Sequence, residues 1–259
     1  MAAGSRTTYA APAVEKAFEI FELLGTRPGG ILISEMAVLL NRSVGELFRI
    51  VVVMERLGYL QKSRKDDRYS VAYKLLDLAY RATPAQDLVA AAGPAMRRLA
   101  IDSGQSCHLV VVNGGSGLVI TREQNPGTRG FSLRLGAPID MLTSCSGRVL
   151  LAFATDERRD HVLAQAVRES PHPLDRAALD RDLATVRKRG FEQRKSPITR
   201  GVTDLSVPVF GFDGLIAAAL TIPFLELIDG SQTVDLAAAR DQLRAAATEI
   251  SATLGYQPD

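Results

Sequence analysis

Four polar residues between positions 42 and 49 have side chains that can read the edges of DNA bases: Arg42, Ser43, Glu46 and Arg49. Arginine can donate two hydrogen bonds to guanine or hold a phosphate, glutamate can accept from cytosine N4, and serine can contact a base or the backbone. If a helix starts after Ser43, then Arg42, Glu46 and Arg49 point away from its apolar face. This spacing predicts a recognition helix that enters the DNA major groove.

A purely structural role is open for the same residues. Ser43 could simply cap the helix, and Arg49 could pair with Glu46 or with Glu22. On spacing alone, base reading and an ordinary solvated helix face are equally supported.

The neighbouring segments complete a winged helix–turn–helix pattern. A short helical pattern at residues 34–40, with Ser34 at its start, is separated from the candidate recognition helix by a break at residues 41–43. Residues 58–69 then form two short strand patterns around a charged tip. We expect Ser34 and the hairpin cations to contact DNA, the cations through phosphates, which position a protein without specifying a sequence. These cations are Lys62, Arg64, Lys65 and Arg68.

The charge of the chain gives only minor support to DNA binding. The formal net charge is +2, which is low for a protein that depends on phosphate contacts. Residues 42–68 hold seven cations and four anions, a net charge of +3. The prediction therefore depends on where the charges lie.

A second candidate site lies at residues 144–147, where Ser144, Cys145 and Ser146 precede a glycine at the predicted start of a helix. Free backbone N–H groups and the helix dipole favour an anion at such a place. A bound ligand carboxylate is one interpretation. The other is that Ser144 or Ser146 only caps the helix.

Catalytic, metal and cofactor chemistry is poorly supported. Cys107 and His108 are adjacent on a predicted strand, so their side chains point to opposite faces and cannot act as nucleophile and base. Two cysteines and three histidines are too few for a disulfide framework or a zinc cluster. No phosphate-binding loop or dinucleotide fingerprint is present. We expect a protein that is not an enzyme and that needs no cofactor or metal.

The distribution of apolar residues argues against a membrane protein. No apolar run approaches the roughly 18 residues of a membrane-spanning helix, since even residues 202–222 are interrupted by Asp204, Pro208, Asp213 and Gly214. The first residues lack the apolar block of a secretion signal. We therefore expect a cytoplasmic protein without membrane contact.

The elements that must position these sites fall into two groups, with a boundary at residues 83–84. Before it, apolar residues at helical spacing predict further helices at residues 12–24 and 73–82. Beyond it, helices are predicted at residues 87–100, 144–154, 156–168, 175–189 and 233–254, and strands at residues 107–112, 118–122, 131–135, 191–195, 202–209 and 215–222. The second group is expected to form an α+β domain with helices against a mostly antiparallel sheet.

Short motifs across both halves carry a family resemblance. They are Ile33-Ser34-Glu35-Met36-Ala37, Arg49, Glu55-Arg56-Leu57-Gly58-Tyr59-Leu60, Tyr69-Ser70-Val71, Leu135-Gly136-Ala137-Pro138, Ser146-Gly147-Arg148-Val149-Leu150-Leu151-Ala152, Arg189-Gly190-Phe191 and Val207-Pro208-Val209. Because these motifs occur in this order and at this spacing, the chain resembles the isocitrate lyase regulator (IclR) family of bacterial transcription regulators over nearly its whole length.

The resemblance implies a winged helix–turn–helix DNA-binding domain with a linker helix at residues 1–83. It implies a GAF-like effector-binding and oligomerisation domain, an antiparallel sheet flanked by helices, at residues 84–259. The implied protein is a homodimer or dimer of dimers on double-stranded operator DNA, a repressor or an activator whose operator affinity is modulated by a small organic or aromatic acid. The alternative is a cytoplasmic small-molecule-binding protein or enzyme whose N-terminal helices serve dimerisation only.

The resemblance also implies an effector pocket with an apolar wall and several polar groups that face the ligand, which we expect to be a carboxylate. Phe131 and Met141 would form the wall, and the later strands would supply polar groups. The implied effector-binding residues are Phe131, Met141, Ser144, Cys145, Ser146, Arg194, Asp204 and Thr221.

The chain departs from the family pattern at positions that bear on specificity. Glu46 stands where Ser or Thr is usual, Arg148 replaces a common Lys, and Asp140 occupies a position that is often Pro. The operator sequence and the identity of the effector are therefore the least transferable implications.

Overall fold

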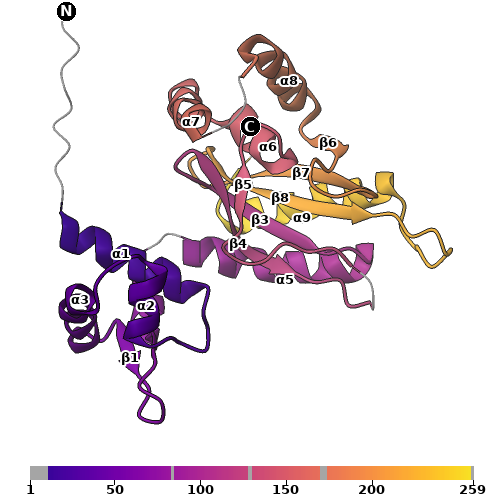
Figure 1. Cartoon of the computed structure of the whole chain (residues 1–259). Helices are drawn as coiled ribbons and strands as arrows, with labels where there is room; N and C mark the ends of the chain where they lie inside the picture. Colours follow the sequence, from indigo (N-terminus) through magenta and orange to yellow (C-terminus); the bar gives the residue numbers. More distant parts are fainter. Residues whose placement is uncertain (1–10, 83–84, 128–129, 170–173, 258–259) are drawn as a thin grey trace, which may run out of the picture. The chain divides into compact units, whose positions relative to one another are not determined.

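The computed structural model describes residues 11–82, 85–127, 130–169 and 174–257. The chain divides into two units, residues 1–83 and residues 84–259; Figure 1 labels most of their helices and strands. Each unit has a hydrophobic core of its own. None of the helices in these described ranges is long and apolar enough to span a membrane.

The N-terminal unit combines helices with a short hairpin. Its helices are α1 (Pro12–Gly25), α2 (Ile33–Leu39), α3 (Val44–Arg56) and α4 (Tyr73–Ala82). Strands β1 (Leu60–Lys62) and β2 (Tyr69–Val71) pair antiparallel and follow α3 directly. This order of elements is a helix–turn–helix with a β-hairpin wing.

A tight turn and a shared core set the orientation of α3. Asn41 lies in the turn between α2 and α3 with a left-handed φ of 51°, which asparagine tolerates better than most residues. On α3, Leu47, Val51 and Met54 recur at three-and-four spacing and are buried against α1 and α2. Their burial fixes which side of α3 faces outward.

The C-terminal unit is built on a six-stranded sheet with the order β5-β4-β3-β8-β7-β6, in which all neighbouring strands are antiparallel. Two meanders, β3-β4-β5 and β6-β7-β8, meet along β3 and β8. The strands are β3 (Cys107–Asn113), β4 (Ser116–Glu123), β5 (Pro138–Asp140), β6 (Glu192–Lys195), β7 (Val202–Phe210) and β8 (Ile216–Leu225).

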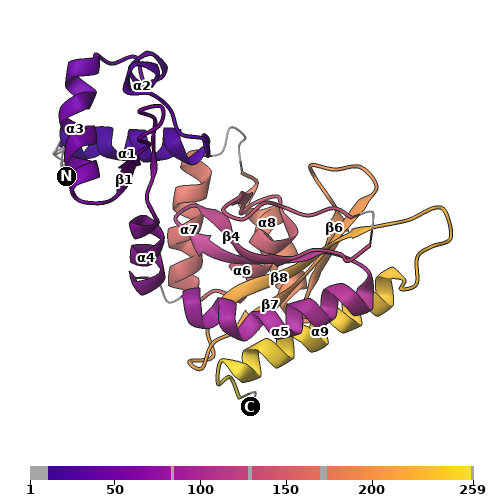
Figure 2. The ribbon, with the colours of Figure 1, turned by 90° about the horizontal axis from the view of Figure 1, so that it is seen from below.

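Helices cover both faces of this sheet. Helices α5 (Ala85–Ser103) and α9 (Leu236–Thr253) run side by side along one face, as Figure 2 shows, and enclose one core cluster. Helices α6 (Cys145–Phe153), α7 (Asp156–Glu169) and α8 (Arg176–Arg189) enclose a second cluster on the other face. The result is an antiparallel sheet between two helical layers, with α6 packed directly against β7 and β8.

The predicted fold class, a winged helix–turn–helix followed by an antiparallel sheet flanked by helices, is confirmed. One strand prediction is wrong, because residues 131–135 form no strand and β5 lies further along the chain. The Arg122 Nη1 group of β4 donates a hydrogen bond to the Leu133 carbonyl at 2.7 Å, and Gly136 turns the chain with a φ of 73°. A side chain and a glycine turn therefore hold this segment, and only the residues beyond the turn join the sheet.

Candidate nucleic-acid interface and ligand cavity

Two of the predicted DNA contacts lie at the starts of helices. Ser43 is the N-cap of α3, and its Oγ accepts a hydrogen bond from the backbone N–H of Glu46 at 3.2 Å. Helix α2 starts one residue earlier than predicted, because Glu35 accepts a hydrogen bond from the backbone N–H of Leu32 at 2.9 Å. Ser34 lies in the first turn of α2 and is exposed. The capping role proposed as an alternative for Ser43 is therefore present.

Arg42 and Glu46 are held by ion pairs. The Arg42 guanidinium lies 3.3 Å from the Glu19 carboxylate of α1 and 4.0 Å from the Glu46 carboxylate. Glu46 also pairs with Lys16 of α1, and the hydrogen bond from Lys16 lowers the pKa of the Glu46 carboxyl. Glu46 is thus an anion that two cations already share, which argues against its accepting a hydrogen bond from cytosine.

Arg49 lies on the outer side of α3 and is exposed. No ion pair or side-chain hydrogen bond joins it to another described residue, so neither Glu46 nor Glu22 takes up its charge. All donors of its guanidinium are therefore available to an external acceptor.

The four cations of the wing differ in whether another residue already neutralises their charge. Lys62 pairs with Asp67 at 2.8 Å, and Arg68 binds both the Glu35 carboxylate and the Gly30 carbonyl at 3.1 Å. The Lys62 ammonium, through its hydrogen bond to Asp67, has a raised pKa. Arg64 and Lys65 lie exposed at the tip of the hairpin, and neither forms an ion pair within the described ranges. These two cations are free to meet phosphate.

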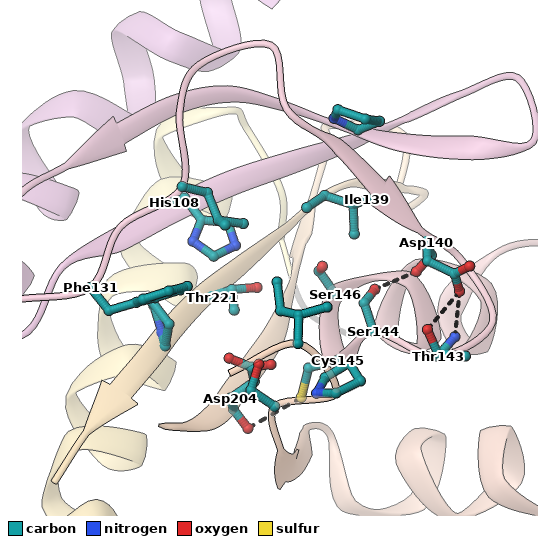
Figure 3. Close-up of a pocket in the computed structure, with 16 residues that line it drawn as sticks. His108, Phe131, Ile139, Asp140, Thr143, Ser144, Cys145, Ser146, Asp204 and Thr221 are labelled. Atoms are coloured by element: carbon teal, nitrogen blue, oxygen red, sulfur yellow. Dashed lines mark hydrogen bonds between the residues drawn. The ribbon is translucent and has the colours of Figure 1, made fainter. Parts of the chain in front are cut away.

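The C-terminal unit contains a cavity of about 220 Å³ between the face of the sheet and the start of α6 (Figure 3). Its wall is largely apolar, with a few polar groups that converge on it. The lining residues are His108, Phe131, Leu133, Pro138, Ile139, Asp140, Thr143, Ser144, Cys145, Ser146, Ser196, Pro197, Ile198, Asp204, Thr221 and Pro223. The volume suits a small metabolite, since pockets for drug-sized ligands begin at roughly 300 Å³.

The structure brings most of the predicted effector residues to this cavity. Those that line it are Phe131, Ser144, Cys145, Ser146, Asp204 and Thr221. Two others are not among its lining residues. Met141 is only 1 % exposed and packs in the core cluster that also includes the lining residue Ile139, whereas Arg194 lies on the edge strand β6 and faces a neighbouring surface depression. The prediction that these two residues line the cavity is therefore wrong.

The start of α6 offers unused hydrogen-bond donors. Ser144 Oγ accepts from the backbone N–H of Gly147 at 2.9 Å and donates to the Asp140 carbonyl at 2.5 Å. The backbone N–H groups of Cys145 and Ser146 have no partner among the described residues. Capping thus satisfies one donor and leaves two that can bind an acceptor in the cavity.

The approach of α6 to the preceding segment requires a glycine. A Cβ atom on Gly147 would lie 2.6 Å from Met141 Cα and 2.7 Å from the carbonyl oxygens of Asp140 and Met141. These backbone atoms cannot move away as a flexible side chain could. Gly147 therefore permits the packing that places the first turn of α6 against the cavity.

Burial controls the ionisation of Cys145 and Asp204. The Cys145 thiol donates a hydrogen bond to the Asp204 carbonyl at 3.3 Å, and burial raises its pKa well above the ordinary value. The thiol therefore stays protonated and unreactive. Burial also raises the pKa of the Asp204 carboxyl, although a hydrogen bond from Ser196 and the charge of Arg194 act in the opposite direction.

The sequence interpretation did not assign four polar residues to the pocket: His108, Asp140, Thr143 and Ser196. His108 is the most deeply buried side chain of these. It is 4 % exposed and lines the cavity, whereas Cys107 points into the core on the opposite face, as strand alternation predicts. Burial lowers the pKa of His108 to about 4, so the imidazole is neutral at physiological pH. The pairing of His108 with Thr221 across β3 and β8 brings it there, and no local sequence signal reveals this pairing.

A winged helix–turn–helix combined with a unit that holds a ligand-sized cavity is the architecture of a ligand-responsive transcription regulator. Comparison with known families agrees with this class. The family model for the IclR helix-turn-helix domain matches residues 13–64, and the model for the bacterial transcriptional regulator IclR C-terminal domain matches residues 80–252. The chain belongs to the IclR family of transcriptional regulators.

Similar proteins cover almost the whole chain. The transcriptional regulator KdgR of Escherichia coli is 28% identical over 94% of this chain and 92% of its own length. The crystal structure of the Thermotoga maritima IclR is 26% identical, with a TM-score of 0.69 over 94% of this chain and 98% of that one. An IclR homologue from Microbacterium hydrocarbonoxydans, in complex with 4-hydroxybenzoate, shares the fold at 23% identity, with a TM-score of 0.78 over 93% of this chain and 98% of that one. These relatives favour a regulator over an enzyme or carrier whose N-terminal helices only dimerise.

Proposed function

We propose that this regulator binds double-stranded operator DNA through residues 1–83 and binds a small organic acid, an aromatic acid being the leading candidate, through residues 84–259. Occupation of the cavity by the acid changes operator affinity. In this proposal the protein acts in the cytoplasm as a homodimer or dimer of dimers, without a cofactor and without enzymatic activity.

The free guanidinium of Arg49 is the observation that carries the DNA-binding proposal. Arg49 is exposed on α3 and unpaired among the described residues, while the nearby charges of Arg42 and Glu46 are neutralised by α1. An arginine presented in this way can donate two hydrogen bonds to a guanine in the major groove. The exposed cations Arg64 and Lys65 would fix the register through phosphates.

The start of α6 supports an acidic effector. The free N–H groups of Cys145 and Ser146 lie at a helix N-terminus, where backbone donors and the helix dipole favour an anion. The apolar wall, which includes Phe131 and Ile139, suits a hydrocarbon or aromatic body. The 4-hydroxybenzoate bound to the Microbacterium homologue makes that compound a reasonable first probe.

Regulation requires the acid to prefer one of two arrangements of the paired DNA-binding domains. A coupling free energy of about 1–3 kcal/mol, equivalent to roughly a 5- to 150-fold change in operator affinity, is typical of such systems. The linker helix α4 is the element that we expect to change its arrangement, because it connects the two domains in the sequence.

The test uses labelled DNA from the region upstream of the protein's own gene. We expect binding that survives an excess of unrelated DNA, weakens steeply as salt rises because counterions are released from phosphates, and changes when 4-hydroxybenzoate or benzoate is added. Binding that unrelated DNA abolishes completely would contradict the operator proposal. Specific binding that no acid alters, despite direct binding of the acid to the protein, would contradict the coupling.

A further inference from the structure

His108 places an unsatisfied imidazole in the wall of the cavity. His108 is 4 % exposed, and its Nδ1 atom is buried and has no hydrogen-bond partner among the residues that the structure describes. Buried polar groups almost always have partners, so an unpaired one at a cavity wall suggests that a ligand supplies the missing bond.

The neighbouring polar groups do not satisfy His108. Thr221 lies directly across from it in the sheet, but the Thr221 hydroxyl is 2.9 Å from Ser206 Oγ and already shares a hydrogen bond there. On the other flank, Arg122 is the cross-strand neighbour of His108, and its guanidinium is bound to the Leu133 carbonyl. The imidazole therefore sits between two groups with partners of their own.

The imidazole and the start of α6 lie on different sides of the cavity. Figure 3 shows His108 beside Phe131 on one side, and Ser144 and Thr143 on the other. A ligand that reached both would offer an acid group to the free N–H groups of α6 and a second polar group to His108. Between these ends it would contact the apolar wall, which includes Ile139.

A neutral imidazole has one donor nitrogen and one acceptor nitrogen, and a hydroxyl group can serve either. A second carboxylate suits this end poorly. The neutral imidazole offers a carboxylate no positive charge, and no lysine or arginine is present among the described lining residues of the cavity. A hydroxyl group adds a hydrogen bond without adding charge.

We propose that His108 hydrogen-bonds a hydroxyl group of the effector, so that the cavity selects hydroxy acids over the same acids without the hydroxyl. This inference rests on the proposed function of the cavity as an acid-binding site. It makes His108 a specificity-determining residue, and it narrows the effector to a monocarboxylic acid with a hydroxyl group at the end remote from α6.

The test compares matched ligand pairs on the full-length protein by isothermal titration calorimetry. The pairs are 4-hydroxybenzoate with benzoate and 4-hydroxybutyrate with butyrate, so that an aromatic and an aliphatic body are sampled, each with its hydroxyl group remote from the carboxylate. We expect the wild-type protein to prefer the hydroxy acid of at least one pair by about tenfold or more, because an analogue without the hydroxyl leaves the imidazole unpaired.

Variants at His108 identify the group responsible for this preference. In His108→Leu the ratio of the two affinities should fall close to one, and a general loss of packing cancels in that ratio because both acids are affected. His108→Gln, which keeps a donor and an acceptor, should retain part of the preference. Unfolding of a variant would leave the wild-type comparison intact as a test.

Three results would overturn the inference: equal affinity within both pairs for the wild-type protein, a preference that persists in His108→Leu, or binding of neither pair. Operator binding measured on the same samples separates these failures from failure of the proposed function. Equal binding of benzoate and 4-hydroxybenzoate, with the same change in operator affinity caused by both, would remove the role of His108 and leave the regulator proposal standing.

Discussion

The Arg42 guanidinium lies 3.3 Å from the Glu19 carboxylate, which ties the turn before α3 to α1. Together with the pair between Lys16 and Glu46, this contact neutralises the charges at the start of α3 within the protein itself. Arg49 forms no ion pair with a described residue, so the hydrogen-bond donors of its guanidinium remain free. The low net charge of the chain is thus compatible with a helix that reads the groove, because base reading depends on the position of one exposed arginine and not on the total positive charge.

The two exposed wing cations should act on DNA binding without affecting sequence preference. Arg64→Ala and Lys65→Ala are each expected to weaken binding to operator and to unrelated DNA by similar factors, because phosphate contacts carry no sequence information. Each substitution should also reduce the slope of log K against log salt concentration by about 1. Fluorescence anisotropy at several salt concentrations measures both effects.

Lys62→Ala provides the matched control on the same hairpin. The Lys62 ammonium lies 2.8 Å from the Asp67 carboxylate. Because this ion pair already partly neutralises its charge, Lys62 should attract a phosphate less strongly than Arg64 or Lys65 does. Its substitution should change the salt slope less than either tip substitution does. A larger loss for Lys62→Ala than for Arg64→Ala would show that the division of the wing into paired and free cations is wrong.

Substitution of Gly147 should destabilise the C-terminal unit. A Cβ atom at this position would meet three backbone atoms at 2.6–2.7 Å, and overpacking of this kind costs about 1–3 kcal/mol. We expect Gly147→Ala to lower the free energy of unfolding by that amount and to weaken acid binding, because the first turn of α6 must shift. Chemical denaturation and calorimetry report the two effects.

Gly45→Ala is the control for that measurement. Gly45 also lies in the first turn of a helix, α3, and a Cβ there would meet no atom within 4 Å. Alanine is favoured over glycine in a helix by about 1 kcal/mol, so Gly45→Ala should leave the stability unchanged or raise it. Equal losses in the two variants would contradict the steric explanation for Gly147.

Stability should depend on pH through Asp204. Burial raises the pKa of this carboxyl, so the folded protein holds the proton more tightly than the unfolded chain does. Ionisation of Asp204 therefore disfavours folding once the pH exceeds the folded-state pKa, and this penalty disappears as the pH falls below the unfolded value. Asp204→Asn should accordingly raise the melting temperature at neutral pH, with a gain that shrinks on acidification. A gain that grows as the pH falls would mean that the sign of the shift is wrong.

Local patterns in the sequence were enough to predict most of the fold. Three-and-four apolar spacing marked α1 and α3, and Gly190, with a φ of 77°, ended α8 as a left-handed cap. The run at residues 131–135 has strand-like composition but is held by the side chain of Arg122, and such a long-range contact has no local signature. Hydrophobic patterning therefore predicts elements better than it predicts which of them join the sheet.

The candidate site was predicted less completely, for a related reason. Ser144, Cys145 and Ser146 were identified because a helix start is a local feature. His108 and the loop residue Ile198 reach the cavity only through tertiary packing. The ion pair between Lys16 of α1 and Glu46 of α3 likewise depends on how the two helices pack. The sequence of α3 alone therefore could not indicate that the Glu46 carboxylate already has a partner.

The substitution Arg49→Ala tests the DNA-binding face of α3 most directly. Arg56→Ala is its control, since Arg56 is also exposed on α3 but lies in the last turn, away from the end that reads bases in proteins of this architecture. In a gel-shift titration at fixed salt, Arg49→Ala should weaken operator binding by about 1–3 kcal/mol, roughly 5- to 150-fold. Arg56→Ala should weaken it less, and the affinity of Arg49→Ala for benzoate should equal that of the wild-type protein. Operator affinity of Arg49→Ala equal to that of the wild-type protein would contradict the assignment of this face of α3 to DNA.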